Sequence, residues 1–461
     1  MWAIAIGAGA LAGACVTRLN TGLNIYCDEE FPCLDRQLKC DMDRHFCVSA
    51  TVTPMVECDA THPCAASAPI CDAMTKKCGA CTMDAQCDAL DKTKPRCLKG
   101  VCAQCTPGSK IDCAMDATKA LCDAAGFCRG CKSGSECTDG VCYDDGRCAP
   151  PDDFIYVNAD TCMMRMPDGS AGAPLCEVAD AIPLVMANKR VVKIAGSLFA
   201  YVKTVAIPGK DVILSGPGRD AMTTARFQVI GASAITIDPN SKVVIDGLTI
   251  SGAGNDGITC SSNSKLTVLR SKLDGNHQAG LNAGSCDVTI DQSWFETNRY
   301  GALRFGPGAK YVVTNSFLIN NGVSAPAVTI DPTAMGTFAF DTVANNYGPS
   351  FGAIDCGMGA TPKVIERSIV WNNGTRPGPS QFNGDCKLVD TLTGEDTADG
   401  AIKDMPLVDG ATFKLMGPVG ANPAIDRVKA GASGLLPDHD GNNRPRPSGK
   451  GWDVGADEFQ Q

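Results

Sequence analysis

Three residues whose types could do chemistry together follow one another at nearly equal spacing in the middle of the chain. Asp256, His277 and Arg299 are separated by 21 and 22 residues. A carboxylate, an imidazole and a guanidinium stacked on one edge of a repetitive fold could bind or transform an acidic sugar, with His277 as the acid/base group. The alternative is that all three are solvated turn residues that make ordinary surface contacts. They are the candidate catalytic residues, and the candidate ligand-binding set adds Asn255, Asn276 and Arg304.

The spacing of these three residues matches the period of a repeat that extends over a longer part of the chain. The structural elements of this repeat must position them. Six segments align: Leu248–Ala253, Ser271–Asn276, Ser293–Asn298, Ser316–Asn321, Asp341–Asn346 and Ser368–Asn373. Their third position is always apolar, and a second and a third short apolar segment follow in most repeats. Three short strands repeated in register predict the coils of a parallel β-helix. Stacked coils bury a continuous aliphatic core that one coil could not build alone.

The sixth position of these segments is Asn in five of the six repeats. One interpretation of this column is a polar binding stripe. The other is structural, because Asn tolerates left-handed backbone at tight turns and stacked Asn side chains can hydrogen-bond from coil to coil. We favour the structural interpretation.

The two ends of this region resemble a known family. Cys176–Asn188 has helical spacing, and a helix there would cover the open end of the solenoid. With the strands of Val191–Gly218, it resembles the opening coils of pectin-lyase-like right-handed β-helix proteins. Asn422–Asp426, Asp438–Pro445 and Asp453–Glu458 resemble the tail of secreted β-helix repeat proteins. The resemblance implies an all-β, right-handed parallel β-helix over residues 151–461, with three short strands per coil and a C-terminal cap in which Asp and Arg pair.

This fold hosts polysaccharide lyases, hydrolases, tailspikes and adhesins, so the fold alone does not decide the function. Resemblance to a lyase would require clustered acidic Ca²⁺ ligands beside an Arg or Lys base. Resemblance to a polygalacturonase would require, among other motifs, paired Asp residues and Gly-His-Gly, and residues 240–375 contain neither. Acidic turn residues could hold Ca²⁺, but no repeated acidic loop defines a metal site.

Residues 16–150 are rich in cysteine and form a separate repeat region. The cysteines fall into five blocks of four: Cys27, Cys33, Cys40, Cys47; Cys58, Cys64, Cys71, Cys78; Cys81, Cys87, Cys97, Cys102; Cys105, Cys113, Cys122, Cys128; and Cys131, Cys137, Cys142, Cys148. Such blocks are too short to build a core, so we expect two disulfides in each, with the pairing left open. Three Cys-x-x-Cys junctions raise metal binding as the alternative. The blocks resemble cysteine-rich repeats of secreted and surface proteins of myxobacteria.

Six further cysteines lie outside the blocks and the first fifteen residues. Cys162 and Cys176 are expected to close a loop. Cys260 and Cys286 are 26 residues apart and Cys356 and Cys386 are 30 apart, which is about one coil, so each pair is expected to join neighbouring coils. The alternative is that they are free buried thiols.

Residues 1–15 are expected to direct export. Ile4–Ala14 is an apolar segment too short to span a membrane and typical of a signal peptide. Leu11–Cys15 also resembles a bacterial lipobox, so Cys15 is either lipidated, which would anchor the protein to a membrane, or lost with the cleaved peptide. Both outcomes leave 26 cysteines, an even number that can pair fully.

The charge and composition narrow the function further. The net charge is −10, so nucleic acid is not an expected partner. We expect an exported monomer, either secreted or anchored at the cell surface. Its β-helix would act as a structural or binding module for polysaccharide or another cell-surface component. The alternative is a polysaccharide lyase or glycoside hydrolase that acts on acidic glycans from the same face.

Overall fold

The computed structural model is described here for the following residues: 38–41, 46–49, 58, 64–107, 112–113, 117–132, 134–162, 166–219, 221, 223–348, 353–359, 361–374, 381–393, 401–402 and shorter stretches between 406 and 457. The predicted leader with Cys15, and the cysteines Cys27 and Cys33, lie outside the described residues. The chain divides into two compact units, residues 1–131 with 144–147, and residues 132–143 with 148–461. None of the described helices is long and apolar enough to cross a membrane.

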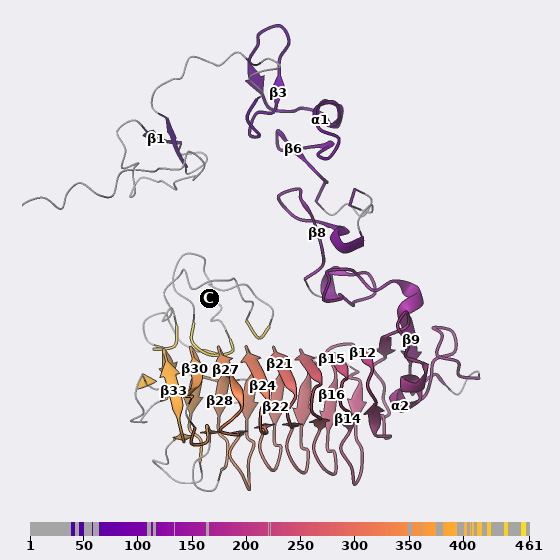
Figure 1. Ribbon diagram of the computed structural model, residues 1–461, viewed down its shortest axis with the longest axis vertical. Coiled ribbons are helices and arrows are strands. Elements are labelled where there is room, and N and C mark those ends of the chain that lie inside the picture. Colours follow the sequence, from indigo (N-terminus) through magenta and orange to yellow (C-terminus); the bar gives the residue numbers. More distant parts are fainter. Residues whose placement is uncertain are drawn as a thin grey trace, which may run out of the picture. The chain divides into compact units, whose positions relative to one another are not determined.

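The first unit consists of short hairpins (Figure 1). Its strands pair as β1 (Leu38–Asp41) with β2 (Phe46–Ser49), β3 (Ile70–Cys71) with β4 (Cys78–Gly79), β5 (Arg96–Leu98) with β6 (Val101–Ala103), and β7 (Leu121–Cys122) with β8 (Cys128–Arg129). Helix α1 (Asp84–Leu90) and the 3₁₀ turn η1 (Ala117–Lys119) lie between hairpins. This region has little regular structure, as the cysteine pattern predicts.

The disulfides follow one pattern, which the sequence left open. Within a block, the third and fourth cysteines are cross-strand neighbours in a hairpin, for example Cys97 and Cys102. They do not bond to each other: the first cysteine bonds to the third and the second to the fourth. The pairs are Cys58–Cys71, Cys64–Cys78, Cys81–Cys97, Cys87–Cys102, Cys105–Cys122 and Cys113–Cys128. Both strands of each hairpin are therefore tied to the loop that precedes it.

The second unit is a parallel β-helix with three sheets, which confirms the predicted fold class. The ten-stranded sheet contains β9 (Phe154–Val157), β10 (Val191–Ile194), β12 (Asp211–Ser215), β15 (Lys242–Asp246), β18 (Lys265–Leu269), β21 (Asp287–Asp291), β24 (Lys310–Thr314), β27 (Met335–Ala339), β30 (Lys363–Glu366) and β33 (Cys386–Val389). The nine-stranded sheet contains β13 (Arg226–Phe227), β16 (Thr249–Ser251), β19 (Lys272–Asp274), β22 (Trp294–Glu296), β25 (Phe317–Ile319), β28 (Thr342–Ala344), β31 (Ile369–Trp371), β34 (Thr391–Leu392) and β35 (Ala401–Ile402). The eight-stranded sheet contains β11 (Val205–Ile207), β14 (Ile235–Ile237), β17 (Ile258–Cys260), β20 (Leu281–Ala283), β23 (Leu303–Phe305), β26 (Val328–Ile330), β29 (Ile354–Asp355) and β32 (Phe382–Asn383).

Alternation along each strand places one set of side chains in the core and the other outside. In the ten-stranded sheet, Ile245, Val268 and Ile290 align from coil to coil and are fully buried. The first, third and fifth positions of the same strands face outward. In-register parallel pairing therefore converts each position of the repeat into a straight row along the solenoid.

The Asn column is a buried ladder. Asn276 Nδ2 donates to Asn298 Oδ1 at 2.7 Å, and Asn298 Nδ2 donates to Asn321 Oδ1 at 2.9 Å. Asn346 and Asn373 continue the ladder. Left-handed backbone, which we expected at these residues, instead occurs one position earlier, for example at Thr297 with a φ of 54°. The column thus serves hydrogen bonding between coils rather than the left-handed turn.

The N-terminal end carries the predicted helix, but the helix is short. Helix α2 (Val178–Ala181) continues into the 3₁₀ turn η5 (Ile182–Leu184), because Pro183 lacks the N–H that a longer α-helix needs. Val178 and Ala181 are fully buried in the main core. Lys210 Nζ donates to the carbonyl oxygens of Ile182 at 2.7 Å and Val185 at 3.0 Å, which satisfies the end of this segment.

Two segments cover outer faces of the β-helix. The fifth cysteine block, which contains η2 (Gly134–Glu136) and the disulfide Cys137–Cys148, precedes η3 (Pro151–Asp153) and packs Val141 and Tyr143 against the first strands of the ten-stranded sheet. The described tail residues, including Phe413 and Ala456, pack on Phe317 of the nine-stranded sheet. The described tail residues therefore pack on the nine-stranded sheet, including its last strands β34 and β35, and the C-terminal cap stays a prediction.

The disulfides of the β-helix follow the coil spacing. Cys260 bonds to Cys286 and Cys356 bonds to Cys386. Cys162 bonds to Cys176 in the segment before the first complete coil. These are the pairs expected from the sequence, and each of the first two joins neighbouring coils.

Candidate functional site

The predicted carboxylate is a structural residue. Asp256 lies in the loop between β16 and β17 and is 6% exposed. One of its oxygens accepts a hydrogen bond from the Ala279 N–H at 2.9 Å, and the other accepts one from Asn282 Nδ2 at 3.0 Å. Both oxygens are thus used to join two coils. Asp256 is therefore not available to bind a ligand or to act in catalysis, the roles that the sequence had suggested.

Asn276, a predicted ligand-binding residue, is likewise not available to a ligand. Its side chain is fully buried and belongs to the Asn ladder. A ligand on the outer surface cannot reach it. The polar type of the residue suggested binding, but its position between two coils commits its amide to the fold.

The other candidates are exposed but occupy two different places. His277 and Arg299 lie at the same edge as Asn255, in the loops that connect the nine-stranded sheet to the eight-stranded sheet, and all three are exposed. Arg304 lies on the outer face of β23, where it aligns with Asn282 and Thr329. The structure supports surface contacts here, but it does not unite the predicted acid, base and cation in one site.

An Arg-x-Lys sequence, a motif of polygalacturonases, occurs at Arg270-Ser271-Lys272. Arg270 is engaged by Asp246, and Lys272 Nζ lies 2.9 Å from a carboxylate oxygen of Glu296. Burial raises the pKa of the Asp246 carboxyl, although the Arg270 guanidinium opposes this effect. Both cations therefore neutralise acids of the β-helix itself.

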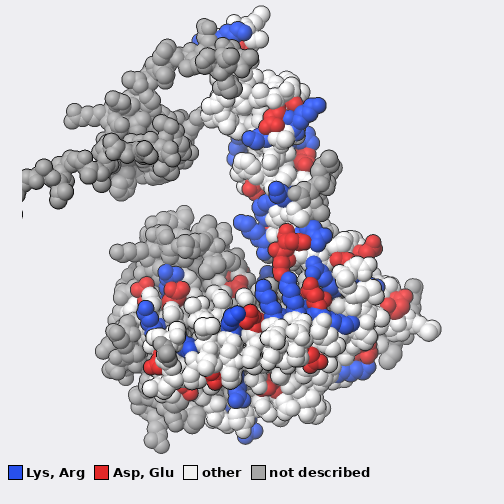
Figure 2. Space-filling model, viewed as in Figure 1, with Lys and Arg blue, Asp and Glu red and all other residues white. Residues whose placement is uncertain are grey.

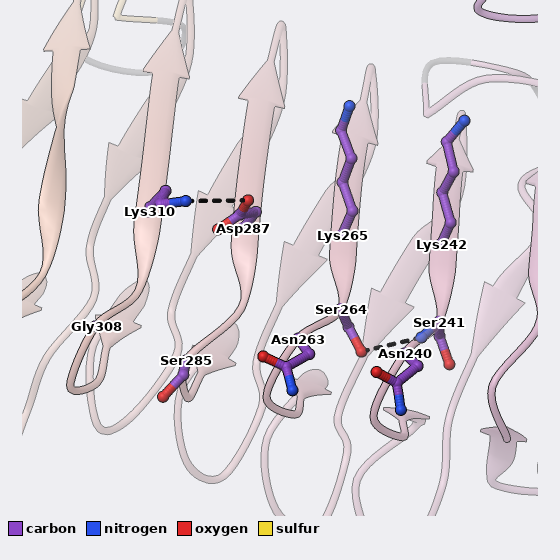
Figure 3. Close-up of a pocket in the computed structure, with 10 residues that line it drawn as sticks. All are labelled: Asn240, Ser241, Lys242, Asn263, Ser264, Lys265, Ser285, Asp287, Gly308 and Lys310. Carbon is purple, nitrogen blue, oxygen red and sulfur yellow. Dashed lines mark hydrogen bonds and ion pairs between the residues drawn. The ribbon is translucent and has the colours of Figure 1, made fainter.

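A groove that the sequence did not suggest lies where the eight-stranded sheet turns into the ten-stranded sheet (Figure 3). It encloses about 610 Å³. Its lining consists of turn residues and the first residues of β15, β18, β21 and β24: Asn240, Ser241, Lys242, Asn263, Ser264, Lys265, Ser285, Asp287, Gly308 and Lys310. Most of these side chains are polar, and none of the predicted candidates lines this groove.

The turns hold this lining in a regular geometry. Asn240 and Asn263 have left-handed backbone with φ of 65° and 58°, which Asn tolerates better than most residues. Behind them, Ser241 and Ser264 are buried, and the Ser264 hydroxyl accepts a hydrogen bond from the Ser241 N–H at 3.2 Å. This arrangement repeats the same turn in adjacent coils and presents the Asn side chains at the lip of the groove.

The charged residues of the groove form one row across four coils. Lys242 aligns with Lys265, Lys265 with Asp287, and Asp287 with Lys310. Figure 3 shows Lys242 and Lys265 extending side by side, whereas Lys310 turns toward Asp287 at 3.8 Å. The row could have been found in the sequence, because the four residues are 23, 22 and 23 positions apart.

The groove continues over the outer face of the ten-stranded sheet. A second hollow shares Lys265, Asp287 and Lys310 with the first and adds Thr289, Val312 and Met335. Val312 and Met335 are 44% and 54% exposed, so this part of the surface combines polar and apolar contacts.

The described residues do not support a metal centre in the cysteine blocks. Within the part of the chain that the structure describes, groups of three or more close His, Cys, Asp or Glu ligand atoms consist of cysteines only. These cysteines are disulfide-bonded, so they offer no thiolate to a metal ion. Binding of Ca²⁺ to acidic turns stays a prediction.

His439 of the tail motif is buried rather than catalytic. Its ring packs edge-on against Phe317 at 4.5 Å between centroids, and its Nδ1 lies 2.9 Å from the Asn315 carbonyl oxygen. Burial lowers the pKa of His439 to about 3, so the ring is neutral at ordinary pH. The residue fastens the tail to the flank of the β-helix.

Two solved structures show a distant similarity to this chain. A pectate lyase variant from Xanthomonas campestris is 15% identical, with a TM-score of 0.33 over 50% of this chain and 78% of the lyase. ORF18 of Geobacillus virus E2 is 11% identical, with a TM-score of 0.29 over 52% of this chain and 61% of that protein. No curated protein matches the sequence. Residues 211–369, which include every coil of the groove, match the family model of the right-handed β-helix region.

Proposed function

We propose that this protein is an exported glycan-binding module, whose β-helix holds an extended sugar chain in the groove along the ten-stranded sheet. The observation that carries the proposal is the groove itself, which crosses four neighbouring coils and is lined by exposed polar side chains. Many disulfides suggest an extracellular or exported protein, where polysaccharides are available. Anchoring through Cys15 is part of this proposal.

The proposal concerns binding without turnover. Asp256 is committed to the backbone of the next coil, and His277, Arg299 and Arg304 are divided between a loop edge and a sheet face. General acid/base catalysis requires a proton-transferring group within hydrogen-bond reach of the reacting bond. The predicted residues do not assemble such a set.

The test compares two matched substitutions in the full-length protein. Thr289→Trp fills the hollow on the ten-stranded sheet, and Thr259→Trp places the same ring at the middle of β17 on the eight-stranded sheet. A glycan array identifies bound sugars, and isothermal titration with the best of them measures affinity. We expect Thr289→Trp to weaken binding about tenfold or more and Thr259→Trp to change it little.

The opposite result would move the site to the eight-stranded sheet. A reducing-end assay on the same sugars is run in parallel, and we expect no product. Release of product that is abolished by Thr259→Trp would replace the binding proposal with the alternative of a lyase or hydrolase.

A further inference from the structure

The cap at the N-terminal end of the β-helix has an apolar outer side. Helix α2 and the turn η5 close this end, and Figure 1 shows α2 at the end of the row of strands. Between positions 178 and 187, Asp180 is the sole charged residue. The side chains turned inward belong to the core and are Val178, Ala181, Ile182 and Val185. The other exposed residues of this segment are also apolar: Pro183, Leu184, Met186 and Ala187.

An apolar outer side is unusual for a cap. The terminal unit of a solenoid has nothing stacked on it, so it normally presents polar side chains to water. The side of this β-helix carries charges of both signs, as the space-filling view shows (Figure 2). The cap therefore exposes apolar surface that its own fold does not require, and such surface on a soluble domain marks a site of interaction.

The loop between β10 and β11 adds three large apolar side chains to this end. Leu198, Phe199 and Val202 are 80%, 67% and 58% exposed. The loop lies against the start of α2, because the N–H groups of Val202 and Lys203 donate to the Glu177 carboxylate. We define the cap surface as Leu184, Met186, Leu198, Phe199 and Val202.

The loop is fixed in place before any partner binds. Ser197 Oγ donates to the Asp160 carboxylate at 2.6 Å, and Tyr201 is fully buried in the core. Asp160 and Glu177, the two acids that hold the loop, are close in sequence to the disulfide Cys162–Cys176. The apolar side chains of the loop are therefore presented by an ordered backbone, which reduces the entropy lost on binding.

Charges around the cap surface have partners within the same chain. Lys203 Nζ lies 2.9 Å from the Asp180 carboxylate, and the Arg190 guanidinium lies 2.8 Å from that of Asp211. Two copies can therefore meet here without placing these charges unpaired against each other, although each chain carries a net charge of −10. A lipid surface would favour free Lys or Arg beside the apolar side chains, and both of these cations are engaged.

The size of the cap surface suits contact with another protein. Its residues together expose about 600 Å² in each copy, compared with about 800 Å² per partner in a standard interface. Contact between flanking residues supplies the remaining area. The same patch on two copies is self-complementary under a two-fold axis, so no second kind of surface is needed.

We propose that the cap surface is the interface of a dimer, in which two β-helices meet end to end around a two-fold axis and bury Met186, Leu198 and Phe199 of both copies. The proposal replaces the monomer expected from the sequence and does not depend on glycan binding. A dimer carries two grooves, so a polymer that occupies both binds more tightly than a polymer that occupies one.

Sedimentation velocity of the full-length protein from about 1 to about 100 µM tests the proposal. We expect a dimer with a dissociation constant in the micromolar range, because the interface lies at the small end of the stable ones. Phe199→Glu places a charge in the apolar contact of each copy and should weaken the dimer at least about tenfold. Hydrogen exchange at the two ends of the concentration range should show protection of residues 196–203 in the dimer.

The control is Val323→Glu, which places the same charge at a residue of similar exposure in the loop between β25 and β26 and should leave the dimer unchanged. Both substitutions are at exposed residues, so unchanged thermal unfolding shows that the variants fold. A monomer at every concentration, or equal weakening by both substitutions, would overturn the proposal. Species larger than a dimer that grow with concentration would also overturn it, since a two-fold contact closes. Binding to phosphatidylcholine vesicles that Phe199→Glu abolishes, without a dimer in solution, would assign the surface to a lipid instead.

Discussion

A cysteine block and a β-helix coil use similar lengths of chain but are stabilised in different ways. The block from Cys81 to Cys102 holds strands of three residues with two disulfides. The coil that begins at Lys242 has no covalent bond within itself and depends on strands paired with the coils on either side. A block is stable through its own cross-links, whereas a coil is stable only as part of a stack.

The largest expected effect comes from removing one disulfide in a block. The double substitution Cys87→Ala with Cys102→Ala opens a cross-link of 15 residues, which stabilises the folded state by about 3 kcal/mol. A segment of this length has a total stability of about 1–3 kcal/mol on the usual scale per residue. We therefore expect residues 81–102 to unfold, as measured by hydrogen exchange and by proteolysis.

The matched change in the β-helix is Cys260→Ala with Cys286→Ala. Here β17 stays paired with β14 and β20 after the disulfide is gone. We expect a lower denaturation midpoint but an unchanged circular dichroism spectrum of the folded state. If the solenoid unfolded and the cysteine block survived its own substitution, the comparison would be reversed.

The next largest effect is expected in the Asn ladder. Asn298→Ala removes an amide that donates to Asn321 Oδ1 and to the Leu273 carbonyl and accepts from Asn276. Because the partners are buried, they lose these bonds without gaining water, and we expect a loss of about 3 kcal/mol in the free energy of unfolding. Chemical denaturation measures it, with the exposed Asn255→Ala as the control. Equal effects of the two substitutions would show that the ladder adds nothing to the stack.

Lowering the pH should change the stability of the β-helix unit through two buried groups whose effects are opposite. Burial lowers the pKa of His439 from 6.5 to about 3, so the unfolded chain binds the extra proton and stability falls as the pH falls through this range. Burial raises the pKa of Asp457 from 3.8 to about 6, so the folded chain binds the extra proton and stability rises as the pH falls. The exposed acids of the cysteine blocks differ: hydrogen bonds, the largest from the Thr75 N–H, lower the pKa of Asp72.

Single substitutions should separate the two buried groups. Relative to wild type, His439→Phe should gain and Asp457→Asn should lose about 2 kcal/mol as the pH falls from about 6 to about 4. Denaturant midpoints at both pH values give these differences. Identical pH dependence in the two variants would mean that the tail does not hold these groups buried in solution.

The smallest effect is expected at the residue that first suggested catalysis. His277 is exposed at a loop edge, so His277→Ala should change the free energy of unfolding by less than about 0.5 kcal/mol. Asp256→Ala, one coil away, should cost about 1–3 kcal/mol because it leaves the buried Ala279 N–H without its acceptor. Thermal unfolding of both variants tests whether the two residues belong to different environments.

The sequence predicted the fold more completely than it predicted the candidate site. Six aligned segments identified the coils, and the spacing between Cys260 and Cys286 identified a disulfide between neighbours. The lysine row follows the same repeat and was equally visible at Lys242, Lys265 and Lys310. The row carries no signal of a site in the sequence, because lysines at the first positions of strands resemble ordinary solvated residues.

The order of residues alone determined the period of the solenoid, the separate cysteine blocks and the column of Asn, because each depends on local spacing along the chain. Only the tertiary structure decided which polar residues are exposed. Asp256 and His277 occupy neighbouring coils, yet one is buried in hydrogen bonds and the other faces solvent. The tertiary structure also decided that, in the three blocks from Cys58 to Cys128, the first cysteine bonds to the third and the second to the fourth, and that hairpin neighbours do not bond to each other. Burial and pairing depend on the coils and loops that pack against a residue, and spacing along the chain does not contain that information.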